Sequence, residues 1–132
     1  MSEGFFSAMC KERNLPYTCE SAGLATITGL PAAENSVRAM SEYGVDISHY
    51  TSTSVDDLNL DDYYLFAVMT QDHKDELVYC GVPAEKIYIL ARDTGGIGDP
   101  YGGSPAIYAV CAKEIKQAVE DLILYLGEHN GD

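Results

Sequence analysis

Residues 95–105 read Gly-Gly-Ile-Gly-Asp-Pro-Tyr-Gly-Gly-Ser-Pro, a glycine-rich loop that carries one carboxylate, Asp99. An apolar run, residues 87–90, precedes the loop, and a long helical pattern begins at Ser104. Glycine lets a backbone turn tightly and approach a ligand, and Pro100 biases Asp99 toward an extended conformation. Open α/β sheets bind ligands at loops that follow the carboxyl ends of their strands. The stretch therefore predicts a site at Asp99, although a flexible connection with an ordinary turn aspartate would show the same pattern.

Apolar periodicity on both sides of this loop predicts helices that alternate with strands. Helices are expected at residues 1–13, about 33–44, 71–80 and 104 to about 127, with a short one from Val55. Strands are expected at residues 17–21, 63–69 and 87–90. Thr70 and Ser104 are the expected N-caps of the two helices that follow them. The alternation predicts a single doubly wound α/β domain over residues 1–132, with a three-layer parallel sheet flanked by helices.

Composition excludes several classes of partner. The 132 residues include 21 acidic and 8 basic side chains, for a net charge of −13. Such a field repels nucleic-acid backbones and anionic membranes, so neither is expected to bind. No apolar stretch approaches the ~20 residues of a membrane span and no signal-peptide pattern is present, so a cytoplasmic protein is expected. The four cysteines and three histidines show no metal-ligand spacing, and we expect no metal or cofactor.

Several short motifs together resemble the low-molecular-weight protein-tyrosine phosphatases. They are Ser21-Ala22-Gly23, Gly29-Leu30-Pro31-Ala32, Gly44-Val45-Asp46-Ile47-Ser48-His49, Val68-Met69 and Asp99-Pro100-Tyr101-Gly102-Gly103. Residues 1–6 also resemble the start of that family's first helix, which directly follows its phosphate-binding loop. The resemblance covers essentially the whole chain in order. It implies the fold of that family and the hydrolysis of a phosphate monoester.

The resemblance implies roles for four residues. Asp99 would be the general acid that protonates the leaving oxygen, and Tyr101 would line the pocket for the substrate ring. Ser21 and His49 match positions that support the phosphate loop by hydrogen bonds. In the family a cysteine thiolate of a Cys-x5-Arg loop attacks phosphorus to form a cysteinyl-phosphate intermediate. The amides and arginine of that loop hold the phosphate oxygens, since amides at a helix N-terminus bind anions and lower the pKa of a cysteine.

The Cys-x5-Arg loop is missing from these 132 residues. Six positions before Arg13, Arg38 and Arg92 stand Ser7, Ala32 and Lys86. The thiols of Cys10, Cys19 and Cys111 are expected to pack in the interior. We therefore expect an N-terminally shortened family member that lacks the first strand and the phosphate loop. Such a chain would have no nucleophile and would be inactive as it stands.

The missing strand has a structural consequence. The family's strand order is 2-1-3-4, so the absent strand would lie between residues 17–21 and 63–69, and three strands would remain. Unpaired strand edges are costly when they are buried. The two flanking strands could close up, another segment could fill the gap, or the chain could be only marginally folded.

Three functions stay open. The first is a phosphatase acting on a phosphorylated protein or a small aryl phosphate once complete. The second is a protein-arginine phosphatase of the same family, since Ile27 stands near a position where many tyrosine-specific members have an aromatic wall. The third is a catalytically dead remnant that binds a partner. Residues 99–103 speak against the arsenate reductases of the family, and the sequence leaves the oligomeric state open.

Overall fold

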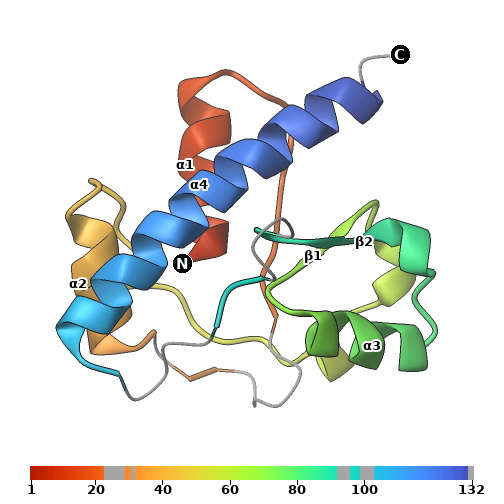
Figure 1. Ribbon diagram of the computed structural model, residues 1–132, viewed down its shortest axis with the longest axis horizontal. Coiled ribbons are helices and arrows are strands. Elements are labelled where there is room, and N and C mark those ends of the chain that lie inside the picture. The colour runs from red at the N-terminus through yellow and green to blue at the C-terminus, as the bar shows by residue number, and fades with distance from the viewer. Residues whose placement is uncertain (23–28, 31, 92–95, 99–102, 131–132) are drawn as a thin grey trace.

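The computed structural model describes residues 1–22, 29–30, 32–91, 96–98 and 103–130. The longer elements, in chain order, are α1 (Ser2–Glu12), α2 (Glu34–Ser41), β1 (Phe66–Val68), α3 (Gln71–Tyr79), β2 (Ile87–Ile89) and α4 (Pro105–Asn130). Short 3-10 helices lie at η1 (Val55–Asp57), η2 (Leu60–Asp62) and η3 (Ala84–Lys86). Figure 1 shows α1, α2 and α4 gathered on one side and β1, β2 and α3 on the other. The α/β prediction is confirmed.

The sheet consists of two parallel strands in the described part of the chain. The pairs are Phe66 with Ile87, Ala67 with Tyr88, and Val68 with Ile89. Because side chains alternate along a strand, the two faces of the sheet meet different helices. Val68 and Ile87 form a small core with Leu77 of α3. On the other face, the ring of Tyr88 lies 4.9 Å from that of Tyr125 in α4.

The segment at residues 17–21 is extended, but it is not a strand of a sheet. Tyr17 and Cys19 pack against the main core, whereas Thr18 and Glu20 are exposed, which is the alternation of a β-strand. No described residue pairs with this segment in a ladder. Two of the three expected strands are therefore present as a sheet among the described residues. Among the described residues, the two segments that would flank the missing strand are not paired in a ladder, but the Tyr63 hydroxyl donates a hydrogen bond to Glu20 Oε2 and so joins them.

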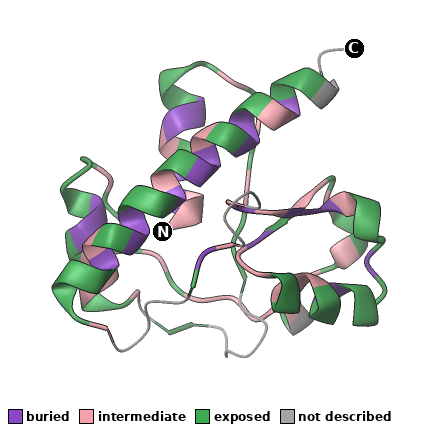
Figure 2. Ribbon diagram, in the orientation of Figure 1, coloured by how far each residue is buried: buried purple, intermediate pink, exposed green. Residues whose placement is uncertain are grey.

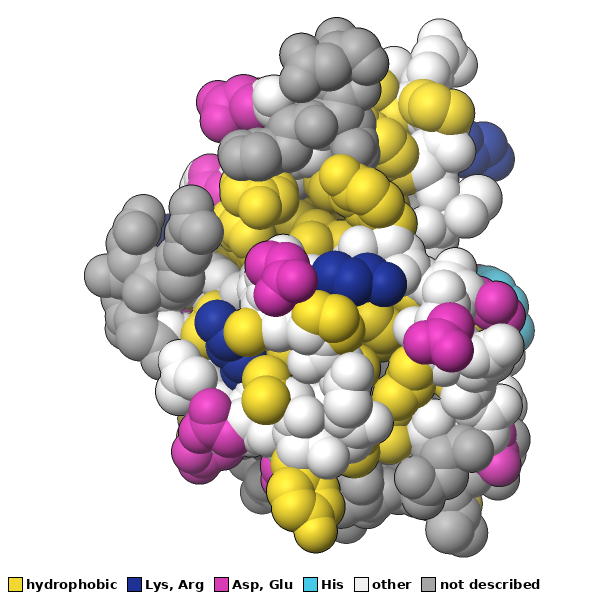
Figure 3. Space-filling model, turned by 90° about the vertical axis from the view of Figure 1, so that its right-hand side faces the viewer, with side chains coloured by type: hydrophobic (Ala, Val, Ile, Leu, Met, Phe, Trp, Pro, Cys, Tyr) yellow, Lys and Arg dark blue, Asp and Glu magenta, His cyan; other side chains and the backbone are white. Residues whose placement is uncertain are grey.

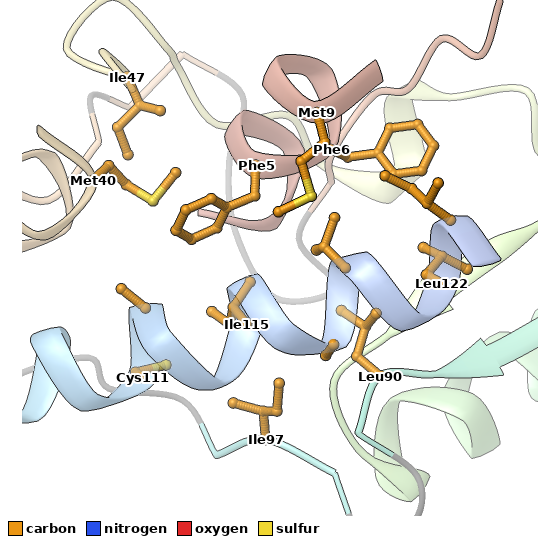
Figure 4. Packing of buried hydrophobic residues seen from close by; sticks show 14 of the residues in the cluster. Phe5, Phe6, Met9, Met40, Ile47, Leu90, Ile97, Cys111, Ile115 and Leu122 are labelled. Carbon is orange, nitrogen blue, oxygen red and sulfur yellow. The ribbon is translucent and has the colours of Figure 1, made fainter. Parts of the chain in front are cut away.

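Helix α4 organises the main hydrophobic core. Its predicted apolar face is confirmed: Tyr108, Cys111, Ile115, Ala118 and Leu122 are buried, and Tyr125 is partly buried. Helix α1 packs Phe5, Phe6 and Met9 against this face, and α2 adds Met40 (Figure 4). Figure 2 shows buried residues on each of these three helices. Full burial of one such side chain contributes about 1.5–3 kcal/mol. The main core therefore packs α1, α2 and α4 together on one face of the sheet.

Both predicted N-caps are confirmed. The Thr70 hydroxyl accepts a hydrogen bond from the His73 amide at 3.3 Å, and the Ser104 hydroxyl accepts one from the Ile107 amide at 3.4 Å. Helix α4 continues to Asn130, beyond the predicted end near Gly127. The buried Leu126 keeps this last stretch packed on the core, which offsets the weak helix propensity of Gly127. In the described residues no helix is both long and apolar enough to cross a membrane.

Candidate active site

The loop that carries Asp99 begins beside the carboxyl end of β1. Asp99 and Tyr101 themselves lie outside the described residues, but Gly98 and Gly103 on either side are described. The Ile97 amide donates to the Met69 carbonyl at 2.8 Å, and the Ile97 side chain is only 2% exposed in the core. Figure 4 shows Ile97 pointing toward α4 between Cys111 and Leu90. The backbone that enters the loop is therefore fixed to both the sheet and α4.

Gly96 makes this close approach possible. Its φ is +98°, a conformation that side-chain-bearing residues rarely adopt. A Cβ at this position would lie 2.5 Å from the Met69 carbonyl oxygen. The Gly96 amide also donates to the Ala91 carbonyl at 3.0 Å.

The far end of the loop is also held. The side-chain amide of Asn35, in α2, donates to the Gly103 carbonyl at 3.3 Å. The next residue, Ser104, caps α4. The described residues on the two sides of residues 99–102 are thus held at the sheet and at the junction of α2 and α4.

Ser21 is bonded to the first turn of α1. Its amide donates to Glu3 Oε1 at 2.8 Å and its hydroxyl donates to the same oxygen at 2.5 Å. Glu3 was not anticipated from the sequence. The available signal was its place in the first turn of a helix, where a carboxylate faces exposed backbone amides. The support role of Ser21 toward a phosphate loop stays a prediction.

His49 follows a short turn in which the Ser48 amide donates to Asp46 Oδ1 at 2.8 Å. Hydrogen bonds from Ser48 hold the pKa of Asp46 below its usual value, with the nearby His49 adding a smaller effect. The His49 ring contacts the Tyr50 ring edge-on at 4.8 Å. In the described part of the chain, no hydrogen bond or ring contact joins His49 to Ser21, so the role of His49 in supporting a phosphate loop also stays a prediction.

Tyr50 links this turn to α1 and to the extended segment. Burial raises the pKa of Tyr50, with smaller contributions from Glu3 and Cys19, while a hydrogen bond from Ser7 opposes them. The Ser7 hydroxyl lies 3.4 Å from Cys19 Sγ, and that thiol is within 3.8 Å of the Glu3 carbonyl. Glu3, Ser7 and Tyr50 thus form a polar cluster with Ser21 that sequence reasoning missed.

Three of the four cysteines, Cys10, Cys19 and Cys111, are poor nucleophiles in this structure, whereas Cys80 is exposed. Burial raises the pKa of both Cys10 and Cys19, and the thiolate rather than the thiol attacks phosphorus. Cys111 is buried, and its thiol lies 3.8 Å from the Gly98 carbonyl. Among the described residues, no three acidic, histidine or cysteine side chains are grouped so that they could hold a metal ion.

The comparisons with known proteins agree with this geometry. A family model described as low molecular weight phosphotyrosine protein phosphatase matches residues 1–130. A crystal structure of a low molecular weight protein tyrosine phosphatase from T. tengcongensis is similar, with a TM-score of 0.85 and 31% identity. The match covers 95% of this chain and 88% of that one.

Two relatives of known name are also similar in sequence. The protein-arginine-phosphatase of Bacillus subtilis is 25% identical over 127 residues, which are 92% of this chain and 84% of that protein. The glutaredoxin arsenate reductase of Synechocystis sp. is 30% identical over 125 residues, which are 93% of this chain and 85% of that protein. The resemblance found in the motifs is confirmed: this chain belongs to the low molecular weight phosphotyrosine protein phosphatase family.

Proposed function

We propose that this chain carries the proton-donating part of a phosphate-monoester hydrolase, with Asp99 as the general acid. The main support is the anchoring of its loop: Ile97 is bonded to the carboxyl end of β1, and Gly103 is bonded to α2. Family membership supports the reaction class. Tyr101, Ser21 and His49 are proposed as substrate-binding and loop-supporting residues.

The proposed chemistry requires a proton at the leaving group. A bond forms between the attacking sulfur and phosphorus as the bond between phosphorus and the leaving-group oxygen breaks. The proton passes from the Asp99 carboxyl to that oxygen. A phenol has a pKa of about 10, so its oxygen leaves poorly as an anion at neutral pH. General acid catalysis of this kind contributes about 10²–10⁴ in rate.

The nucleophile is proposed to be absent from these 132 residues. No Cys-x5-Arg sequence occurs among them. Of the cysteines, Cys10 and Cys19 have raised pKa values and Cys111 is buried. Cys80 is exposed, but the residue six positions after it is Lys86 and not arginine. Hydrolysis therefore requires a thiolate and an anion-binding loop from residues outside this sequence, and we propose that the 132 residues alone do not turn over substrate.

The direct test is hydrolysis of p-nitrophenyl phosphate by two polypeptides. The 132-residue chain should give no rate above a buffer control. A second polypeptide, extended by the codons read in frame before Met1, should contain a Cys-x5-Arg loop and hydrolyse the substrate. In that form Asp99→Asn should lower kcat by about 10²–10⁴, while Asp57→Asn, at an exposed position, should not. Hydrolysis by the short chain that disappears with one cysteine replacement would overturn the proposal, as would an upstream sequence without the loop.

Phosphoarginine is the second candidate substrate. The B. subtilis relative named protein-arginine-phosphatase supports it, and so does Ile27, which stands near a position where many tyrosine-specific members have an aromatic wall. Rates of the extended form on a phosphotyrosine peptide and on a phosphoarginine peptide of the same sequence would separate the two candidates. Arsenate reduction is disfavoured even though one relative is named a reductase, because the stretch Asp99-Pro100-Tyr101-Gly102-Gly103 speaks against the reductases of the family.

A further inference from the structure

The side chain of Asn35 links α2 to the backbone just before α4. Its amide donates a hydrogen bond to the Gly103 carbonyl at 3.3 Å, although the two residues lie 68 positions apart in the sequence. Both residues are half-buried, and partial exclusion of water strengthens such a bond. Figure 1 shows α2 beside the N-terminal part of α4. The contact therefore joins α2 to a backbone position four residues after Asp99 in the sequence.

Asparagine is an unfavourable residue for the helical position that Asn35 occupies. It is the second residue of α2, and asparagine has a lower helix propensity than alanine because its side chain competes for backbone hydrogen bonds. Asn35 does not cap the helix either, since the N-cap is Ala33. A residue that weakens its own element without a local gain is expected where a function requires it. The bond to Gly103 gives Asn35 such a role outside α2.

The carbonyl that Asn35 meets is not one that the backbone of α4 uses. The Tyr108 amide donates to the Ser104 carbonyl at 3.1 Å, which is the first hydrogen bond of that helix, since the helical ladder begins at the carbonyl of the N-cap. The Gly103 carbonyl lies one residue earlier and therefore outside the ladder. A side chain from another helix thus supplies a donor at this position.

A second side chain contacts the described backbone on the other flank of Asp99. The Cys111 thiol lies 3.8 Å from the carbonyl of Gly98, the residue directly before Asp99. A thiol is a weak hydrogen-bond donor, whereas the amide of Asn35 is an ordinary one. Of these two contacts, the bond to Gly103 is therefore the stronger, and its removal should have the larger effect.

We propose that Asn35 is a positioning residue for the proton donor Asp99. Its amide holds the Gly103 carbonyl and so keeps the Asp99 carboxyl where it can protonate the leaving oxygen. Asn35 acts through Asp99 and does not itself contact the substrate. The inference rests on the proposed function, because it requires Asp99 to be the general acid. A displacement of about 1 Å in a reacting group can cost about 10²-fold in rate.

The residues expected before Met1 complete the hydrolase away from Asn35. The family's first strand is expected in the apolar groove lined by residues 17–22 and 62–69. Figure 3 shows apolar side chains gathered on the side of the molecule that lies to the right in Figure 1, whereas α2 lies to the left. None of the described residues that line the groove belongs to α2. We therefore expect the extended polypeptide to keep the bond between Asn35 and Gly103.

The test compares kcat/KM of the extended polypeptide on two aryl phosphates. Phenyl phosphate releases a phenol with a pKa of about 10 and needs the proton, whereas the far more acidic phenol of 2,4-dinitrophenyl phosphate leaves readily as an anion. Asn35→Asp keeps the size of the side chain and removes its donor. It should lower kcat/KM by about 10- to 10²-fold on phenyl phosphate, but by less than about threefold on the dinitrophenyl ester, which gains little from a general acid.

Two further variants separate positioning from folding. Asn35→Ala also removes the donor and has a higher helix propensity, so it should keep the circular dichroism spectrum of the parent and show the same dependence on the leaving group. Glu34→Gln is the matched control in the same turn. It breaks only an exposed ion pair with Arg38, which contributes little, and should leave both kcat/KM values unchanged. In the Asp99→Asn background, Asn35→Asp should cost less than about twofold more, because effects that pass through one group are not additive.

Asp99→Asn, measured in parallel, distinguishes two kinds of failure. An extended polypeptide without activity, or one whose rate on phenyl phosphate survives Asp99→Asn, would overturn the hydrolase proposal and the role of Asn35 with it. If Asp99→Asn lowers the rate while both Asn35 variants match the parent, only the role of Asn35 is wrong. Equal losses on the two substrates would assign Asn35 to stability instead. A full additional loss in the Asp99→Asn background would show that Asn35 does not act through Asp99.

Discussion

A Cβ placed on Gly96 would lie 2.5 Å from the carbonyl oxygen of Met69. This contact fixes the start of the Asp99 loop to the end of β1. Gly96→Ala should lower the free energy of unfolding by about 1–3 kcal/mol, the cost of a strained backbone, because neither a backbone carbonyl nor a φ of +98° can adapt cheaply. Urea denaturation followed by circular dichroism measures the change.

Gly98→Ala is the matched control for that variant. A Cβ at Gly98 meets nothing within 4 Å and its φ is not in the left-handed range. It should therefore change stability by no more than about 0.5 kcal/mol, the usual limit for surface substitutions. Equal losses at the two glycines would contradict the close approach at Met69.

Gly4 in α1 should respond in the opposite way to Gly127 in α4. A Cβ at Gly4 would lie 2.8 Å from Ile47 Cγ2 and 2.9 Å from Met40 Cε, whereas one at Gly127 meets nothing within 4 Å. Overpacking a core costs about 1–3 kcal/mol, so Gly4→Ala should destabilise. Gly127→Ala should stabilise by up to about 1 kcal/mol through helix propensity. Thermal unfolding of both variants gives the two signs, and a gain at Gly4 would show that the α1–α2 contact is loose.

The elements that are predictable from sequence are those whose signals are local. Helix α4 has a capping Ser104, a proline at its first position and apolar residues in steps of three and four. Each of these features acts within a few residues, so the helix and its buried face were both predicted. The apolar run before Met69 likewise predicted β1, although only Phe66–Val68 pair with β2.

Residues 17–21 show where such reasoning ends. Their alternation predicts an extended backbone, which the structure has, but pairing depends on a neighbour that the local sequence does not specify. The Glu3–Ser21 hydrogen bond joins residues 18 positions apart in the sequence, and no local sequence pattern predicts it. For the candidate site, the motifs identified the family, while the placements of Asp99 and Tyr101 lie outside the described residues and stay predictions.

Thr70 should contribute to stability as the cap of α3. Its hydroxyl accepts from the His73 amide, and loss of such a cap typically costs about 0.5–2 kcal/mol. Thr70→Ala should show a loss in this range by urea denaturation, and Thr70→Ser should recover most of it. If serine fails to restore stability, the methyl group rather than the hydroxyl carries the effect.

Glu3 should hold the end of the extended segment against α1. Its carboxylate accepts both the amide and the hydroxyl of Ser21, and both bonds are exposed, so Glu3→Ala should cost only about 0.5–1.5 kcal/mol. The sharper readout is local: hydrogen exchange at the Ser21 amide should become faster. Glu12→Ala, at the other end of α1 and exposed, is the control. Unchanged exchange at Ser21 would mean that the segment is held by the packing of Tyr17 and Cys19 alone.

Stability should fall at alkaline pH because several acids have raised pKa values in the fold. Burial raises the pKa of Cys10 and Cys19 above 9.0, and that of Tyr50 above 10.0. The unfolded chain releases these protons first, so the stability they contribute is complete below about pH 9 and is lost as pH rises. Cys19→Ala should flatten this decline in urea-denaturation midpoints measured from pH 8 to 10.5. An unchanged slope would show that the Cys19 thiol titrates as it does in the unfolded chain.

The amino group of Met1 should produce the opposite slope just below pH 8. Burial lowers its pKa from 8.0, and the neighbouring Glu3 and Cys111 oppose this only in part. Between the folded pKa and 8.0 the unfolded chain holds a proton that the folded chain does not, so stability should rise with pH in that window. N-terminal acetylation removes the titrating group and should abolish this rise while leaving the alkaline decline in place. A rise that survives acetylation would assign it to another group, and a fall across the same window would mean that the amine is better accommodated charged.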